Sequence, residues 1–153
     1  MQYNVLFVCI HNSARSQMAE AFLNNLGEGV FIAESAGLEA GTLNPNVVQV
    51  MSEIGIDISR NKTQNAFDLF KQGKRYNAVI TVCDAANAER CPVFPGIVNR
   101  LAWSFPDPSS FTGTQEEILN QTRAVRDWIK EKVAEFAHDG KEFKFWLKQE
   151  ATN

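Results

Sequence analysis

The chain has 153 residues, which suits one domain that buries roughly 70% of the surface its unfolded form exposes. Its composition, 44% hydrophobic and 22% charged, is that of a folded globular protein. A net charge of −3 argues against nucleic acid or an anionic membrane as the main partner, because both bind basic surfaces. The longest apolar run, Val5 to Ile10, is too short to span a bilayer, and no basic segment precedes it as in a signal peptide.

The cysteine content bears on the compartment. The chain has three cysteines, an odd number in a sequence long enough to fold without disulfides. Free thiols of this kind are typical of a reducing cytosol rather than of a secreted framework. We therefore expect a cytoplasmic protein with reduced cysteines.

The first third of the chain alternates between strand and helix patterns. Tyr3 to Val8 is apolar and rich enough in strand-forming residues for a strand buried on both faces. Ser16 to Leu26 has apolar residues at helical spacing and ends at Gly27. Val30 to Ala33 is the second predicted strand, closed by the segment Ser35-Ala36-Gly37.

The same alternation continues to the end of the domain. Asn44-Pro45 opens a second helix that Gly55 ends, with proline at a tolerated first-turn position. A short helix over Ala66–Lys71 and strands over Ala78–Val82 and Val98–Trp103 follow. Thr114 then begins a long helix, because Glu117 three residues later completes a capping box.

Strands separated by helices indicate an α/β fold with a parallel sheet. We expect a three-layer architecture in which helices flank four parallel strands, over a domain of residues 1–138. Residues 139–153 form a C-terminal tail of unassigned role. Ligands of such sheets bind beyond the carboxyl ends of the strands. Cys9, Cys83 and Asp107 each follow a predicted strand, so they should meet at one edge of the sheet.

The segment from Cys9 to Ser16 runs from a strand into a helix within one short loop. Successive backbone N–H groups there can form a concave nest for a tetrahedral anion, towards which the helix dipole points. Arg15 adds a planar fork that holds two oxygens, and Ser16 can donate to the sulfur of Cys9. A thiol beside such donors ionises easily and becomes a nucleophile. The predicted oxyanion-binding residues are Ile10, His11, Asn12, Ser13, Ala14, Arg15 and Ser16.

Three further residues are catalytic candidates. Asp107, in Ser104-Phe105-Pro106-Asp107-Pro108, can serve as the general acid that protonates a leaving oxygen. Cys83 closes a strand, and the polar, alanine-rich segment that leads from it to Cys91 has no strong apolar anchor. If this segment rearranges, Cys83 can reach Cys9 and later pair with Cys91. Both thiols can alternatively be buried core residues.

Several stretches together resemble the arsenate reductases that have the low-molecular-weight tyrosine phosphatase fold. The similarity begins at Val8-Cys9 and runs from Asn12 to Ala21. It continues, in order, at Glu34-Ser35-Ala36-Gly37, Asn44-Pro45, Gly55-Ile56-Asp57-Ile58-Ser59 and Phe105-Pro106-Asp107-Pro108. The resemblance covers roughly residues 3 to 137.

The resemblance implies a thiol relay. Cys9 attacks arsenate, Cys83 displaces arsenite by attacking Cys9, and Cys91 then pairs with Cys83 in a disulfide that thioredoxin reduces. Arsenate, phosphate or sulfate is the expected occupant of the anion loop. Cys9, Arg15, Cys83, Cys91 and Asp107 are thus the expected catalytic residues.

The resemblance also implies that four residues support the loop, in some relatives partly through a potassium ion. They are Asn12, Ser16, Glu20 and Ser35. Gln64 stands where an acidic partner is expected, so we expect neither a cofactor nor a metal. In two further departures, Ala14 replaces a cysteine that some relatives have, and the segment between Cys83 and Cys91 is slightly long.

Alternative functions share parts of this site. A low-molecular-weight tyrosine phosphatase would use Cys9, Arg15 and Asp107 in hydrolysis, but such phosphatases usually have an aromatic residue after Asp-Pro, where Ser109 stands. A non-catalytic thiol sensor for arsenite or zinc would need neither Arg15 nor Asp107. A zinc site also lacks a Cys-x2-Cys pair. Glutaredoxin or mycothiol remain alternatives to thioredoxin.

Overall fold

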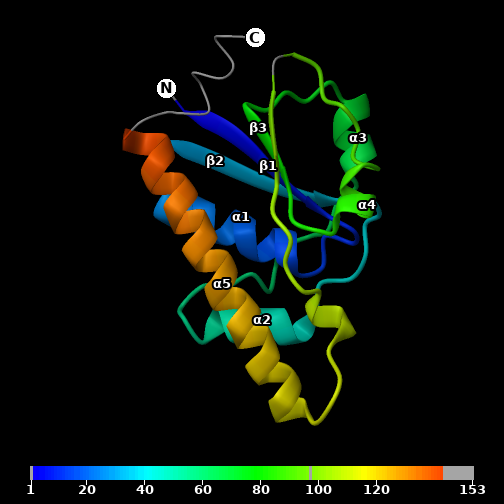
Figure 1. The fold of residues 1–153 in the computed structure, drawn as a ribbon, viewed down its shortest axis with the longest axis vertical. Helices are drawn as coiled ribbons and strands as arrows, with labels where there is room; N and C mark the ends of the chain where they lie inside the picture. Colours follow the sequence, from blue (N-terminus) through cyan, green and yellow to red (C-terminus); the bar gives the residue numbers. More distant parts are fainter. Residues whose placement is uncertain (1, 97, 143–153) are drawn as a thin grey trace.

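Four parallel strands form the centre of the protein in the computed structural model, which describes residues 2–96 and 98–142. The strands lie in the order β2-β1-β3-β4, so β1 is hydrogen-bonded to both β2 and β3. Their bounds are Tyr3–Cys9 for β1, Phe31–Gly37 for β2, Ala78–Thr81 for β3 and Asn99–Ala102 for β4. The expected four-stranded parallel sheet is confirmed (Figure 1).

The helices follow the predicted order with one addition. They are α1 (Arg15–Leu26), α2 (Pro45–Ser52), α3 (Ala66–Lys71), α4 (Ala85–Ala88) and α5 (Gln115–Glu142), with a 3-10 turn over Pro108–Ser110. The sequence pattern did not predict α4, which lies in the polar segment after Cys83. Helix α5 continues to Glu142, so the predicted boundary after residue 138 falls inside it. The rest of the predicted tail, residues 143–153, lies outside the described residues.

The sheet separates two hydrophobic clusters, because successive side chains of a strand point to opposite faces. In β1, Val5, Phe7 and Cys9 belong to the first cluster, whereas Leu6 and Val8 belong to the second. Helices α1, α2 and α5 supply the first cluster, and α3 supplies the second. This gives three layers, with the sheet in the middle (Figure 1).

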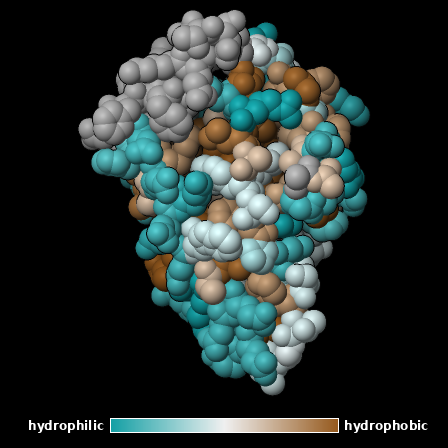
Figure 2. Space-filling model, viewed as in Figure 1, coloured by the Kyte–Doolittle hydropathy of each residue, from teal (hydrophilic) through white to brown (hydrophobic). Residues whose placement is uncertain are grey.

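Long helix α5 is amphipathic rather than apolar throughout. Its inward face includes Val125, Ile129 and Val133, which are buried in the first cluster. Its outward face is mainly hydrophilic over most of its length (Figure 2). In the part of the chain that the structure describes, no helix combines the length and apolar character needed to cross a membrane.

Candidate active site

The segment between β1 and α1, here called the anion loop (residues 9–16), is held from outside through its carbonyl oxygens. The backbone N–H groups of Leu38, Glu39, Gly41 and Asn44 donate to the carbonyls of Cys9, Ile10, His11 and Ser13. Met18 N donates to Ala14 O, and Gln17 Nε2 donates to Asn12 O. Within residues 2–96 and 98–142, no protein acceptor takes the N–H groups of residues 11–16. These donors are therefore available to an anion.

The start of α1 contributes to the same cradle. Ala14 occupies the cap position, and its side chain cannot satisfy the first N–H groups of the helix. Other helices of the chain are capped, as α2 is by the side chain of Asn44. The uncapped end of α1 thus directs unpaired donors and the positive end of its dipole at the loop.

Two glycines allow the neighbouring segment to approach the loop. Gly37 lies opposite Cys9 in the pairing of β1 with β2. A Cβ atom on Gly37 would lie 2.7 Å from Asn12 N, and one on Gly41 would lie 2.9 Å from the Cβ of His11. Any larger residue at either position would push residues 38–44 away from the loop carbonyls.

Asn12 is the buried centre of the loop. Its backbone is left-handed, with φ at 55°, a conformation that asparagine tolerates better than most residues. Its Nδ2 donates to Ser16 Oγ at 2.8 Å and to Ser35 Oγ at 2.9 Å, and its Oδ1 accepts from the backbone N–H of Gln64 at 3.0 Å. The structure thus brings together three of the four residues expected to support the loop.

Cys9 is buried at the end of β1, where its Sγ lies 2.9 Å from Ser16 Oγ. Because Asn12 already donates to that hydroxyl oxygen, the hydroxyl proton of Ser16 is free to point at the sulfur. The Ser16 hydroxyl thus lies beside the sulfur that the sequence marks as the nucleophile.

Glu20, the fourth expected support residue, is hydrogen-bonded to Ser35. The Ser35 hydroxyl donates to Glu20 Oε1 at 3.1 Å. Burial raises the pKa of Glu20 to about 7, against the opposing effect of the Ser35 hydrogen bonds, and the charge of Glu34 adds to the increase. A carboxyl in this environment gains and loses its proton near neutral pH.

Gln64 contacts the two residues, Ser35 and Asn12, that lie at the centre of the loop support. Gln64 Nε2 donates to Ser35 O at 2.8 Å, and its backbone N–H donates to Asn12 Oδ1. Gln64 thus fixes the loop directly through hydrogen bonds. Among the described residues, no three or more His, Cys, Asp or Glu side chains are grouped as metal ligands.

Arg15 connects the anion loop to the segment that follows β4. Its Nη1 donates to Phe105 O at 3.1 Å, and its Nη2 lies 3.7 Å from Asp107 Oδ2. The other carboxylate oxygen of Asp107 accepts from Ser109 N at 2.9 Å and so caps the 3-10 turn. The guanidinium is buried and retains N–H groups for an oxyanion, while the Asp107 carboxyl remains about one-third exposed.

The three cysteines are free thiols, and they divide between the two faces of the sheet. Cys9 and Cys83 belong to the first cluster, whereas Cys91 belongs to the second. Burial raises the pKa of Cys83, Arg15 lowers it, and the neighbouring Cys9 raises it further. Burial also raises the pKa of Cys91 to about 11. The structure thus brings together Cys9, Cys83 and Arg15, while Cys91 packs in the second cluster, where the charge of Cys83 also contributes to its raised pKa.

Sequence reasoning missed one support residue, Gln17. Its side chain is 1% exposed, and its Nε2 also donates to Asn12 Oδ1 and to Lys62 O. Its Oε1 accepts from Asn61 Nδ2, so Gln17 links the loop to the segment before α3. The only sequence feature that could have indicated this role is its place inside the motif that begins at Cys9. Helical periodicity alone predicts that a glutamine lies on the surface.

A cysteine in an anion-binding loop after the first strand, with an aspartate after the fourth, defines a thiol enzyme of the phosphatase type. The sequence profile of the low molecular weight phosphotyrosine protein phosphatases matches residues 4–145. The chain therefore belongs to the low molecular weight phosphotyrosine protein phosphatase family.

Within this family, several similar proteins are arsenate reductases. The arsenate reductase of Bacillus subtilis (strain 168) is 42% identical over 137 residues, which is 90% of this chain and 96% of that protein. A solved arsenate reductase in the phosphate binding state is 31% identical with a TM-score of 0.71, covering 91% of this chain and 98% of the other. A thioredoxin-dependent arsenate reductase from Corynebacterium glutamicum is 25% identical with a TM-score of 0.58, over 86% of this chain and 62% of that one.

Proposed function

We propose that this chain is a cytoplasmic arsenate reductase that uses its own cysteines as a relay and a thioredoxin-type protein as final reductant. The observation that carries the proposal is the packing of a second thiol, Cys83, in the same cluster as Cys9, beside the anion loop and Arg15. A hydrolase needs only the first thiol. The names of the similar proteins from Bacillus subtilis and Corynebacterium glutamicum support the same activity, and the second, which is thioredoxin-dependent, also supports the reductant.

The first step follows from the loop. The free N–H groups and the Arg15 fork hold three oxygens of arsenate, with arsenic facing Cys9 Sγ. The Cys9 thiolate attacks arsenic and forms a sulfur–arsenic bond. The oxygen opposite the sulfur leaves as water, after Asp107 gives it a proton. Arsenic is still As(V) in this adduct.

The second step is the redox step. Cys83, as its thiolate, attacks Cys9 Sγ and forms a Cys9–Cys83 disulfide. The sulfur–arsenic bond breaks, its electron pair stays on arsenic, and arsenite leaves as As(III). The positive charge of Arg15 favours the Cys83 thiolate, whereas burial opposes it. Two electrons have then passed from the two sulfurs to arsenic.

The third step regenerates the nucleophile. Cys91 attacks Cys83, which frees Cys9 and leaves a Cys83–Cys91 disulfide. Because Cys91 starts in the cluster on the other face, the segment that contains α4 must rearrange before the two sulfurs can meet. The dithiol of a thioredoxin-type protein then reduces this disulfide and becomes oxidised itself.

The second candidate activity is slow hydrolysis of phosphate esters. The position of Asp107, whose Oδ2 lies 3.7 Å from Arg15 Nη2, favours it, because this carboxyl can act as a general acid beside the anion loop once it takes up a proton. Such hydrolysis would begin with the same attack by Cys9, but water would resolve the intermediate. It would therefore need neither Cys83 nor Cys91.

Three cysteine variants test the relay and separate the two activities. Arsenite formed per enzyme is measured with and without thioredoxin and thioredoxin reductase, beside hydrolysis of an aryl phosphate. Cys9→Ser should lose both activities. Cys83→Ser should lose arsenate reduction but keep the hydrolysis. Cys91→Ser should form about one arsenite per enzyme and stop as a Cys9–Cys83 disulfide, visible by mass spectrometry.

Two results would contradict the proposal. Normal thioredoxin-supported turnover by both Cys83→Ser and Cys91→Ser would mean that the second thiol comes from elsewhere. Hydrolysis by the unsubstituted protein without any arsenite, even in one turnover, would make it a phosphatase.

A further inference from the structure

Two segments, here called walls, flank the anion loop. The first is the segment of residues 38–44, whose last member, Asn44, donates its backbone N–H to Ser13 O at 2.9 Å. The second is the segment of residues 105–109, which Arg15 holds through Phe105 O. Any substrate of Cys9 must enter between these walls, because the opposite side of the loop is occupied by the core.

One hydrogen bond joins the two walls. Asn44 Nδ2 donates to Ser109 Oγ at 3.2 Å, and we call this contact the lip bridge. Asn44 Oδ1 is committed to the start of α2, where it accepts from Asn46 N and Val47 N. Ser109 in turn donates its backbone N–H to Asp107 Oδ1. The lip bridge therefore lies directly beside the carboxyl that serves the leaving oxygen.

The position of this bridge matters because of the geometry of displacement. The leaving oxygen lies opposite the attacking sulfur and within hydrogen-bond reach of the general acid. In free arsenate or phosphate that oxygen carries at most a proton. In an ester it carries an organic group, which must then pass Asp107 and press against Ser109 and Asn44.

We propose that the lip bridge between Asn44 and Ser109 determines substrate preference, favouring free tetrahedral oxyanions over their aryl esters. This inference rests on the proposed arsenate reductase, for which a phosphate ester would be a competing ligand. A cavity of about 340 Å³ adjoins the bridge, and Leu43, Phe111 and Ile118 are among the residues that line it. Opening the bridge would give an aromatic ring access to this partly apolar space.

The test measures binding without turnover, in a Cys9→Ser background. Dissociation constants of inorganic phosphate and of phenyl phosphate are determined by calorimetry for the background protein and for added Ser109→Ala or Asn44→Ser. Serine at position 44 still caps α2 but is too short to reach Ser109. Each substitution should lower the ratio of the phenyl phosphate constant to the phosphate constant roughly threefold to tenfold, the effect of one hydrogen bond. The double variant should show no further change.

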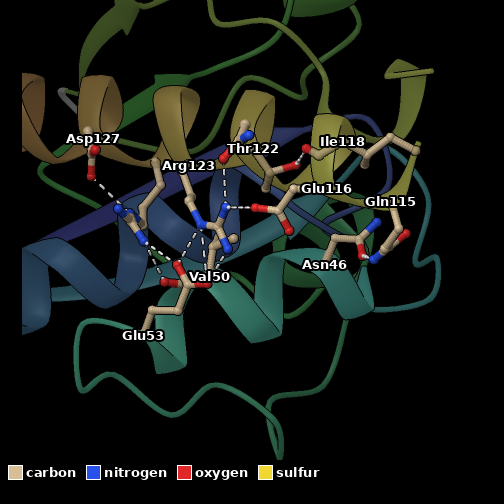
Figure 3. Close-up of polar contacts among 11 residues, drawn as sticks. Asn46, Val50, Glu53, Gln115, Glu116, Ile118, Thr122, Arg123 and Asp127 are labelled. Carbon is tan, nitrogen blue, oxygen red and sulfur yellow. Dashed lines mark hydrogen bonds and ion pairs between the residues drawn. The ribbon is translucent and has the colours of Figure 1, made fainter. Parts of the chain in front are cut away.

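The matched control removes a different side-chain hydrogen bond, which joins α2 to α5. Gln115 Nε2 donates to Asn46 Oδ1 at 2.8 Å (Figure 3), and neither residue takes part in the lip bridge. Gln115→Ala should leave the ratio unchanged. The inference is overturned if Ser109→Ala and Asn44→Ser leave the ratio unchanged, if Gln115→Ala shifts it equally, or if the two bridge substitutions act additively.

Arsenite formation by the Cys9-containing protein separates this inference from the proposed function. A shifted ratio without arsenite formation would support the bridge and reject the reductase. Normal arsenite formation with an unshifted ratio would support the reductase and reject the bridge.

Discussion

Arg15 provides both the charge and the two-point geometry of the anion loop. Its Nη1 is fixed by Phe105 O, so the fork is oriented before an anion arrives. Arg15→Lys keeps the charge but loses the fork. We expect the dissociation constant of inorganic phosphate, measured by calorimetry, to rise roughly tenfold or more. The circular dichroism spectrum should not change. Arg123→Lys is the control, and equal affinities in both variants would place the anion elsewhere.

Glu20 should make the stability of the fold depend on pH. Its pKa is raised from an ordinary value of 4.5 to about 7, so the folded chain holds this proton more tightly than the unfolded chain. The resulting stabilisation is complete below about pH 4.5 and is lost as pH rises through 7.

Glu20→Gln tests this dependence, because glutamine keeps an oxygen for the Ser35 hydroxyl but does not titrate. The free energy of unfolding of the variant should rise relative to the unsubstituted protein between about pH 4.5 and 7. The slope should reach at most about 1.4 kcal/mol per pH unit and vanish above pH 8. Urea denaturation at several pH values measures it. A constant difference across this range would show that Glu20 does not titrate there.

A group of charged side chains joins α2 to α5. Glu53 pairs with Arg126. It also pairs with Arg123, which in turn pairs with Glu116 (Figure 3). Hydrogen bonds from Arg123, followed by those from Arg126, hold the pKa of Glu53 below its ordinary value. Arg126 is the more buried arginine, and its Nη1 also donates to Val50 O at 2.9 Å.

Replacing each arginine by alanine should separate their contributions. Arg126→Ala leaves a buried carbonyl without a donor and should lower the free energy of unfolding by about 1–3 kcal/mol. Arg123→Ala should cost less, because its ion pairs are exposed to solvent. Urea denaturation measures both. A larger loss for Arg123→Ala would mean that the exposed charges, rather than the buried hydrogen bond, hold α5 on α2.

The segment from Cys83 to Cys91 should change when it is oxidised. A disulfide requires two sulfurs about 2 Å apart, whereas these two thiols pack in clusters on opposite faces. Amide hydrogen exchange over residues 84–96 should therefore be roughly tenfold or more faster after one arsenate turnover than in the reduced protein. Exchange in β1 should not change. In Cys91→Ser, arsenate should leave residues 84–96 protected, and equal exchange in all samples would exclude the rearrangement.

For the molecule as a whole, local patterns predicted most of the architecture. The apolar run before Cys9, the capping box at Thr114 and the glycine stops located the strands and the main helices to within a few residues. The convergence of Cys9, Cys83 and Asp107 followed from strand ends alone, because parallel strands share one edge.

Other features could not be predicted because they depend on long-range contacts. Alternation within a strand predicts opposite faces, but it does not predict which face a returning segment will cover, so the sequence could not assign Cys91 to the second cluster. The burial of Gln17 arises from partners distant in sequence, such as Asn61. The four-residue helix α4 is too short for a periodic signal.

Because the carbonyls of the anion loop are bonded from outside, its N–H groups are left for an oxyanion. The melting temperature of this protein should therefore depend on the anion in the buffer. Without an oxyanion, the N–H groups of the loop and the guanidinium of Arg15 bring positive charge together with no counter-ion. Any oxyanion that binds only the folded chain therefore stabilises it by mass action. At one hundred times its dissociation constant, such an ion contributes about 2.7 kcal/mol. The protein should therefore melt at a higher temperature in phosphate than in a zwitterionic buffer of equal ionic strength. Arg15→Lys should remove most of that difference.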